Sequence, residues 1–324
     1  MFNIVSFLAQ AIKFSTIFIF GAVGEILTEK SGHLNMGIPG IMCLGALGGL
    51  LGESIYISSV PASSPLNGFM IVFVPIIFAM IFASLGGLLF AFFSVTLRCN
   101  QNVTGLTLTT FGVGFSCYFI GEIKTNRMAE AGLQLQSMFK GYDKLGWFGD
   151  IFLSQSAFTY LAIIIAVVCA VILSKTRIGL NLRAVGENPA AADSASINVN
   201  AYRYIATIIG AAIAGIGGIF FELDKAKGMF NPADGIDAYG WLALCLVIFS
   251  LWKSSIAIGT SFVFACFSIL PDSGIQFPSN SVRALFRILP YLITIIILII
   301  ISIRNKKENQ PPNALGQSYF REDR

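Results

Sequence analysis

Residues Ser54–Leu97, SIYISSVPASSPLNGFMIVFVPIIFAMIFASLGGLLFAFFSVTL, carry no charged side chain. A membrane-spanning helix needs roughly 20 predominantly apolar residues, so this stretch is long enough to leave a membrane and cross it again. Its cluster of turn-forming residues is Pro61–Pro65, followed by Asn67 and Gly68. The stretch therefore predicts the end of one spanning helix, a short turn and a complete second span.

The rest of the chain is also rich in apolar residues and poor in charged ones. Of its 324 residues, 55% are hydrophobic and 12% are charged, and the mean hydropathy is +0.77. Soluble domains carry about 25% charged residues, so this composition indicates an all-α, multi-pass membrane protein. On the scale of roughly 20 residues per span, the apolar segments predict about nine transmembrane helices, within a range of eight to ten, at 6–26, 36–57, 69–97, 102–123, 153–174, 203–222, 239–252, 254–271 and 287–303. The segment at 239–252 is short for a span, which predicts a tilted or broken helix.

Positive charge sets the expected orientation, because cytoplasmic loops of membrane proteins are enriched in lysine and arginine. The loop at 175–202 is basic, and so is Arg304–Lys307 after the last span. Both are therefore predicted to be cytoplasmic, which with nine spans puts the N-terminus outside. Lys13, inside the first span, is expected to extend toward the outer surface. The outer loop at 124–150 is either a receptor-docking surface or a plain solvated loop.

The chain thus divides into a membrane domain at 1–303, which contains the loop at 175–202, and a cytoplasmic tail at 304–324. The tail has Pro311 and Pro312, many polar residues and no hydrophobic period. Such a segment buries too little apolar surface to offset the entropy of ordering it, so we expect it to be disordered.

Composition also narrows the chemistry. The six cysteines are scattered through apolar segments without a Cys-x-x-Cys pair, which is typical of small buried hydrophobic residues. His33 is the single histidine, so His-rich metal sites are excluded and a Ser-His-Asp mechanism is disfavoured. The sequence has no Gly-Lys dipeptide and therefore no phosphate-binding loop of the G-x-x-x-x-G-K-[ST] type. The small net charge of +4 gives no indication of a nucleic-acid partner. We expect no catalytic residue, cofactor or metal on this chain.

Small residues recur at fourfold spacing in two predicted spans. One set is Gly45, Gly49 and the overlapping Gly48 and Gly52, and the other is Gly210, Ala214 and Gly218. Such spacing lets helices approach closely in lipid. The simpler interpretation is packing within one bundle, and the alternative is a seam between two subunits.

The stretch Leu182–Asp193, LRAVGENPAAAD, interrupts the apolar pattern with a polar segment. Asn188 is a good N-cap, Pro189 suits the first helical position, and the alanines that follow propagate a helix. The stretch predicts a short capped helix facing the cytoplasm, with side chains small enough to lie closely in a groove of a cytosolic protein.

Two longer motifs resemble one protein family. Gly24–Ala46, GEILTEKSGHLNMGIPGIMCLGA, is similar to the early signature of bacterial ABC-transporter permeases of the sugar and nucleoside import class. Arg177–Val199, RIGLNLRAVGENPAAADSASINV, resembles the cytoplasmic coupling region of that family, and Gly235–Leu246 aligns loosely with a stretch near its last spans. The resemblance extends over most of the chain, from near residue 20 to near residue 300.

The resemblance implies an integral importer subunit in the bacterial inner membrane, with 1–303 as its transmembrane permease domain. Members of the family work with cytosolic ABC ATPases, which hold the ATP and Mg, with a second permease subunit and with an extracytoplasmic solute-binding lipoprotein. This chain resembles the shorter permease of the nucleoside importers, which implies a heterodimer. Coupling to the ATPase is then assigned to Arg183, Ala184, Gly186, Glu187, Asn188, Pro189, Ala190 and Asp193. Within this set, Arg183 and Glu187 pair either with the ATPase or with each other.

One position departs from the family. Its early signature commonly has a glutamate where this chain has Pro39, so no substrate contact is carried over to that position. The expected solute is a small hydroxylated molecule. A nucleoside leads, a pentose or hexose sugar follows, and a ribityl vitamin such as riboflavin is the third candidate.

The segment at 32–40 is too rich in glycine for an ordinary helix. Broken backbone at membrane depth survives only where protein buries it or a cavity solvates it, and discontinuous helices often mark solute sites in transporters. Asn35, Gly37 and Pro39 are therefore either candidates for the translocation pathway or parts of a structural turn.

Thr104, Thr107 and Thr110 share one helix face and are further pathway candidates. Their hydroxyls either line a path for a hydroxylated solute or bond to carbonyls of their own helix. Glu25 and Glu122 lie near the ends of predicted spans, and we expect both to be solvated rather than functional.

Two functions of other classes compete with an importer subunit. An ion-coupled secondary transporter would normally hold ionisable residues at mid-span, and apart from Lys13 the predicted span centres lack them. An intramembrane enzyme would need paired catalytic side chains at depth, such as H-E-x-x-H, which one histidine does not supply.

Overall fold

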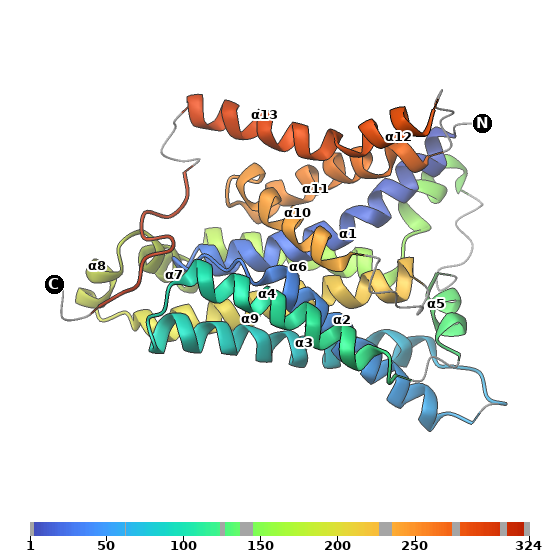
Figure 1. Ribbon diagram of the computed structural model, residues 1–324, viewed down its shortest axis with the longest axis horizontal. Coiled ribbons are helices and arrows are strands. Elements are labelled where there is room, and N and C mark those ends of the chain that lie inside the picture. Colours follow the sequence, from blue (N-terminus) through green and yellow to red (C-terminus); the bar gives the residue numbers. More distant parts are fainter. Residues whose placement is uncertain are drawn as a thin grey trace.

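A computed structural model describes residues 3–61, 63–123, 127–136, 145–226, 235–273, 279–304 and 310–320. The regular structure of these residues is helical, and the long helices run along the long axis of the molecule (Figure 1). They are α1 (Ile4–Glu29), α2 (Ile38–Ser59), α3 (Gly68–Ala91), α4 (Gln101–Ile120), α6 (Ala157–Lys175), α9 (Val199–Phe220), α10 (Ile236–Phe249), α11 (Ser254–Ile269) and α13 (Leu289–Arg304). The short helices are α5 (Met128–Gln136), α7 (Arg177–Glu187), α8 (Pro189–Ser194) and α12 (Asn280–Arg287). Short π-helical segments are η1 (Phe92–Thr96), η3 (Gly149–Leu153) and η4 (Phe221–Lys225), and η6 (Leu270–Asp272) is a turn of 3-10 helix.

Each predicted span coincides with one of the long helices. In the described residues, six stretches are long and apolar enough to cross a membrane, namely Ile4–Glu29, Ile38–Ser59, Gly68–Thr96, Ala157–Lys175, Val199–Lys225 and Ser254–Asp272. Ile236–Phe249 is apolar but short, as predicted for a tilted or broken segment. The all-α multi-pass class is therefore confirmed, whereas the count of nine spans is not, because six helices of the described residues meet the length and composition of a span.

The helices begin where the sequence supplies caps. The side chain of Asn67 accepts from the Phe69 amide at the start of α3, at 2.9 Å, and that of Asn100 accepts from the Asn102 amide at the start of α4, at 3.0 Å. Such bonds satisfy amides that have no partner within the first turn. The turn predicted from Pro61–Pro65 lies between α2 and α3.

Glycine brings the central helices into backbone contact. A methyl group on Gly45 of α2 would collide with Gly215 of α9, and one on Gly24 of α1 would collide with Gly210 of α9. Gly48 faces the other way, where a methyl group would lie 2.6 Å from Phe82 of α3. The small residues thus pack helices of one bundle, which confirms the simpler interpretation of their spacing and makes α9 the central helix.

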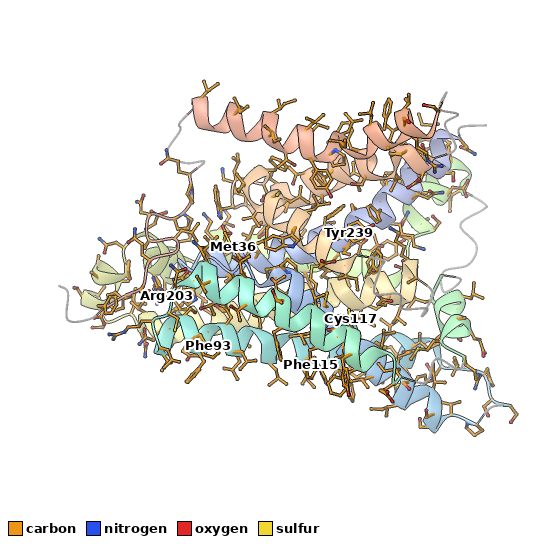
Figure 2. All side chains as sticks on the ribbon, in the orientation of Figure 1. Met36, Phe93, Phe115, Cys117, Arg203 and Tyr239 are labelled. Atoms are coloured by element: carbon orange, nitrogen blue, oxygen red, sulfur yellow. The ribbon has the colours of Figure 1, made fainter. Side chains whose placement is uncertain are left out.

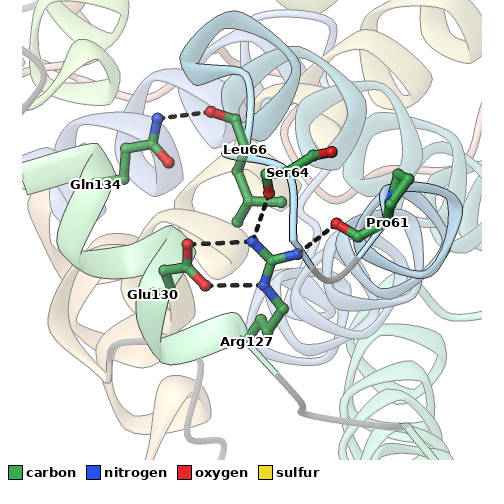
Figure 3. A network of polar contacts seen from close by, with 6 residues as sticks. All are labelled: Pro61, Ser64, Leu66, Arg127, Glu130 and Gln134. Atoms are coloured by element: carbon green, nitrogen blue, oxygen red, sulfur yellow. Dashed lines mark hydrogen bonds and ion pairs between the residues drawn. The ribbon is translucent and has the colours of Figure 1, made fainter.

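At one end of the bundle, α5 is fastened to the turn between α2 and α3 (Figure 3). The Arg127 guanidinium forms a paired contact with Glu130, with Nε at 2.8 Å from Oε2, and donates to the carbonyls of Pro61 and Ser64 at 3.3 and 3.0 Å. Gln134 donates to the Leu66 carbonyl at 2.8 Å. The Arg127 contact lowers the pKa of Glu130 below its ordinary value. Part of the predicted outer loop is thus a docked helix, and its residues 124–126 and 137–144 lie outside the described residues.

The two ends of the bundle differ in what they carry. The N-terminus, α5 and α12 lie at one end, and α7, α8 and the C-terminal segment lie at the other (Figure 1). Lys13 does not simply extend outward, because its ammonium pairs with Asp224 at 2.7 Å at the first of these ends. Glu122 is exposed, as expected.

Candidate coupling site

The polar stretch after α6 forms two short helices in series, α7 and α8. Thr176 caps α7 by accepting from the Gly179 amide at 3.1 Å. Asn188 caps α8 by accepting from the Ala191 amide at 3.0 Å, with Pro189 in the first helical turn. The predicted capped helix is confirmed, and the structure adds that a helix precedes it.

The two helices are held by a small apolar cluster at their base. Val185 of α7, Ala192 of α8 and Val199 of α9 are all buried and pack together, with Tyr202 and Tyr319 beside them. Asn181 donates to the Tyr202 hydroxyl at 2.9 Å. The opposite side of α7 and α8 is exposed, so the pair presents one face outward while its other face is fixed to the bundle.

The proposed coupling residues divide between these two faces. Arg183, Glu187 and Asn188 are exposed, and Ala184, Pro189, Ala190 and Asp193 are half-buried. Gly186 is buried, and a methyl group there would collide with the carbonyl of Lys30. Arg183 and Glu187 are not bonded to each other: Arg183 Nε donates to the Gly179 carbonyl at 3.4 Å, and Glu187 accepts from the Asn313 amide at 3.4 Å.

Beneath Gly186 lies the turn at 30–37, between α1 and α2, which we call the hub. Within it, Gly32 has φ +88°, a conformation that favours glycine. The Leu34 amide donates to Gln101 of α4 at 2.8 Å, and the Asn35 amide donates to Glu25 of α1 at 3.0 Å. His33 Nδ1 lies 3.2 Å from the Thr207 hydroxyl of α9. The hub therefore connects α1, α4 and α9 at the point where α7 rests.

The hub is supported by buried polar side chains that the sequence analysis misread or missed. Glu25 is completely buried, so the expectation that it is solvated is wrong. Glu29, one helical turn later, is also buried and accepts from the indole N–H of Trp252. Their partners lie on the hub and after α10, far away in sequence, and no local pattern indicates them.

Arg203 is the largest side chain among the fully buried ones and lies at the α7 end of the bundle (Figure 2). Its Nη1 donates to the Gln317 carbonyl at 3.2 Å. Burial, and after it this cation, lowers the pKa of His33 well below its ordinary value, which favours the neutral imidazole. A neutral imidazole suits its buried contact with Thr207.

The C-terminal segment 310–320, which the sequence analysis expects to be disordered, packs against this end of the bundle (Figure 1). The Ala314 amide donates to the Gly186 carbonyl at 3.0 Å, and the Gly316 amide donates to the Gly32 carbonyl at 3.1 Å. The Tyr319 hydroxyl donates to Asp193 of α8 at 2.8 Å. The segment thus connects α7, α8 and the hub, whereas 305–309 and 321–324 lie outside the described residues.

The pathway candidates of the glycine-rich segment are buried. Asn35 Oδ1 accepts from the Gly37 amide at 2.9 Å just before α2 begins. Pro39 packs against α10, where a methyl group on Gly240 would lie 2.5 Å from its Cα. These contacts favour the structural turn, and a pathway role for the three residues stays a prediction.

The threonine candidates lie on a different surface. Thr104, Thr107 and Thr110 each donate to the carbonyl four residues earlier, at 2.9, 2.8 and 3.1 Å, as the simpler interpretation predicts. Thr107 and Thr110 are exposed, and Thr104 and Thr107 line a groove of about 490 Å³ between α3 and α4. The other residues of that groove are apolar or weakly polar: Leu89, Phe90, Phe93, Cys99, Val103, Leu108 and Phe111.

Comparison with known proteins agrees with this architecture. A family model described as branched-chain amino acid transport system / permease component matches residues 7–298. The nucleoside ABC transporter permease protein NupC of Lactococcus lactis is 30% identical over 299 residues, which cover 90% of each chain. The putative glucose ABC transporter permease protein TsgC13 of Haloferax volcanii is 29% identical in an alignment of 335 positions, gaps included, that covers 97% of each chain.

A third relative, the guanosine ABC transporter permease protein NupQ of Bacillus subtilis, is 28% identical over 287 residues, which cover 86% of each chain. No solved structure matches the chain. Because the family model covers almost all of the helical bundle, the chain belongs to the family of branched-chain amino acid transport system permease components and is a multi-pass subunit of an ABC transporter in the cell membrane.

Proposed function

We propose that this permease imports a small hydroxylated solute, with a nucleoside as the first candidate, and that a cytosolic ATPase drives it through α7 and α8. The geometry of the coupling site carries the proposal. Arg183, Glu187 and Asn188 face outward, while Gly186 beneath them rests on the hub. A movement imposed on the outer face would pass through the hub into α1, α4 and α9, and ATP binding would then bias the bundle between two states.

The distribution of charge supports a cytoplasmic position for the α7 end. At the opposite end, Lys13, Arg127 and Arg283 each form an ion pair with a carboxylate. At the α7 end the described residues include seven lysines and arginines, and enrichment in lysine and arginine is typical of the cytoplasmic side. These cations are Lys30, Arg98, Lys175, Arg177, Arg183, Arg203 and Lys253.

The names of the relatives indicate which candidate solute should be tested first. NupC is named for nucleosides and NupQ for guanosine, whereas TsgC13 is named for glucose. A nucleoside therefore leads and a hexose follows, and both are hydroxylated. Riboflavin is a candidate only because its ribityl chain is hydroxylated, and it is the third type of solute in the test. ATP and Mg belong to the partner ATPase in this proposal.

Two further partners complete the proposed importer. The face of α4 that carries Thr107, Thr110 and Phe111 is exposed, and together with Phe93 before α4 it leaves a surface on which a second permease subunit would pack; we propose that this subunit is non-identical. The two permeases would enclose the pathway. A solute-binding lipoprotein would dock at the end that carries α5. An ion-coupled transporter is not favoured, because the relatives are ABC transporter permeases.

The decisive experiment is purification of the tagged chain from its native membrane, followed by ATPase measurement in nanodiscs. Nucleosides, hexoses, pentoses and riboflavin are added singly with the binding protein. We expect an ATPase to co-purify and one solute to stimulate it. Replacing Arg183 and Glu187 together by alanine should reduce that stimulation about 10-fold, which corresponds to a coupling free energy of ~1.4 kcal/mol.

Arg177→Ala is the matched control, because Arg177 is an exposed cation of the same helix outside the proposed set. It should leave the stimulation unchanged. If no ATPase co-purifies with the chain, the coupling proposal fails and uptake driven by an ion gradient becomes the better hypothesis.

A further inference from the structure

A second groove lies between α6 and α11 at the α7 end of the bundle. It has a volume of about 660 Å³. Four cations belong to its lining: Lys30 of the hub, Lys175 at the end of α6, Arg183 of α7 and Lys253 before α11. The lining also includes Trp252, which is buried.

Among the described residues, the lining of this groove holds four cations and no carboxylate. None of its four cations forms an ion pair there. The two carboxylates that act electrostatically on Lys30 also accept hydrogen bonds from other groups: Glu29 accepts from Trp252, and Glu187 accepts from the Asn313 amide. Burial lowers the pKa of Lys30; Glu187 opposes this shift, and Arg183 and Lys253 reinforce it. A cation held under these conditions gains from an anion beside it.

The N-terminus of α11 opens into the same groove. Lys253 precedes the helix without a side-chain cap, so the amides of Ser254 and Ser255 have no acceptor within the helix. Ser254 is 2% exposed, and its hydroxyl has no hydrogen-bond partner among the described residues. Backbone amides, the positive end of a helix dipole and a buried hydroxyl together form a binding site for an oxyanion.

The rest of the lining is mostly apolar and belongs to α6 and α11. Val167, Ala170, Val171 and Ser174 occur at i, i+3, i+4 and i+7, so they form one stripe on α6. Val167 and Val171 are 48% and 50% exposed, on a helix apolar enough to cross the membrane. Ile258 of α11 faces this stripe across the groove. The groove therefore joins an anion site to a surface that fits an acyl chain.

We propose that this groove binds one anionic phospholipid, with its phosphate at Ser254, Lys30, Arg183 and Lys253 and an acyl chain along Val167 and Val171. Basic pockets between transmembrane helices on the cytoplasmic side are the known chemistry for such headgroups. The lipid then belongs to the inner leaflet, a placement that rests on the proposed orientation. Its phosphate contacts Arg183 of α7 and the hub, so it would hold the coupling site against the bundle.

The test is lipid binding by the purified, delipidated chain in detergent, followed by native mass spectrometry and thermal unfolding. The probes are dioleoyl-phosphatidylglycerol, dioleoyl-phosphatidylcholine and inorganic phosphate. We expect the phosphatidylglycerol to bind more tightly than the phosphatidylcholine and to raise the unfolding temperature. Lys30→Gln with Lys253→Gln should weaken its binding about 30-fold, since each cation near an anionic headgroup contributes roughly 5-fold.

Arg177→Gln is the matched control, because this exposed cation lies at the same end but outside the groove, and it should bind lipid like the unmodified chain. Should the Lys30 variant fail to fold, Lys175→Gln with Lys253→Gln removes two exposed cations and tests the same point. Val167→Gln separates the two sources of phosphate, because it should weaken binding of the lipid and leave binding of inorganic phosphate unchanged.

Three results would overturn the proposal: equal binding of the two lipids, equal binding by the double variant and the unmodified chain, or full protection by inorganic phosphate alone. Displacement of phosphatidylglycerol when the ATPase assembles would also overturn it, by showing that the groove is part of the subunit interface. None of these measurements requires transport, so the lipid proposal and the proposed function can fail separately.

Discussion

At the scale of single residues, the coupling site depends on polar groups buried where an apolar bundle would be expected. Glu29 meets Trp252, and His33 meets Thr207, across sequence separations that no local pattern reveals. Burying such groups costs free energy unless each finds a partner, so their positions are set by the fold and not by neighbouring residues. This is why sequence reasoning found the apolar spans but took Glu25 for a solvated residue.

His33 provides a test of this buried polar layer. Its pKa is lowered well below the ordinary value by burial and by Arg203, so the folded chain keeps it neutral. The unfolded chain titrates it near pH ~6.5, so below that pH only the unfolded state gains the proton. The free energy of unfolding is therefore unaffected by His33 titration above pH ~6.5. Below that pH, the titration lowers it by up to about 1.4 kcal/mol per pH unit.

The measurement is the thermal unfolding midpoint of the chain in detergent between about pH 8 and about pH 5. Compared with His33→Gln, which does not titrate, the unmodified chain should lose more stability as the pH falls through this window. Parallel pH profiles for the two chains would show that His33 is not held neutral by the fold.

At the scale of elements, the local part of the coupling site was predictable and the long-range part was not. The cap at Asn188 and the helix that follows are set by adjacent residues, and the structure places both as predicted. The C-terminal segment has no period of its own, and its order comes from contacts with Gly32, Gly186 and Asp193, which precede it by more than a hundred residues. Composition alone therefore misses it.

Removal of residues 310–324 should destabilise the α7 end of the bundle. Arg203 would lose the Gln317 carbonyl that its Nη1 contacts, and a buried charged group without its partner costs roughly 1–3 kcal/mol or more. We expect a lower unfolding temperature, and in the assembled transporter a weaker solute stimulation of the ATPase. Tyr319→Phe, which removes only the bond to Asp193, should cost about 1 kcal/mol.

Asn313→Ala is the control for this series, because the exposed Asn313 contacts the bundle through its backbone amide. It should behave like the unmodified chain. A truncated chain that unfolds at the unmodified temperature would show that the segment lies on the bundle without stabilising it.

At the scale of the whole molecule, the positions of the long helices followed from hydrophobicity alone. A run of apolar residues is stable inside a membrane as a helix, and such runs are visible directly in the sequence. What they do not give is which helix lies at the centre. Contacts such as Gly45 against Gly215 identify α9 as central, and they depend on how distant segments fit together.

The orientation of the molecule yields the last prediction. If enrichment in lysine and arginine marks the cytoplasmic end, a cysteine at Ala195, in the exposed link after α8, should be inaccessible from outside the cell, and one at Leu145, beside η3, should be accessible. The chain is expressed alone in a Cys99→Ser background, because Cys99 is exposed. A membrane-impermeant maleimide should then label Leu145→Cys in intact cells and Ala195→Cys only in inverted vesicles. The reverse pattern would place α7 and α8 outside, where no cytosolic ATPase reaches them, and would remove the physical basis of the coupling site.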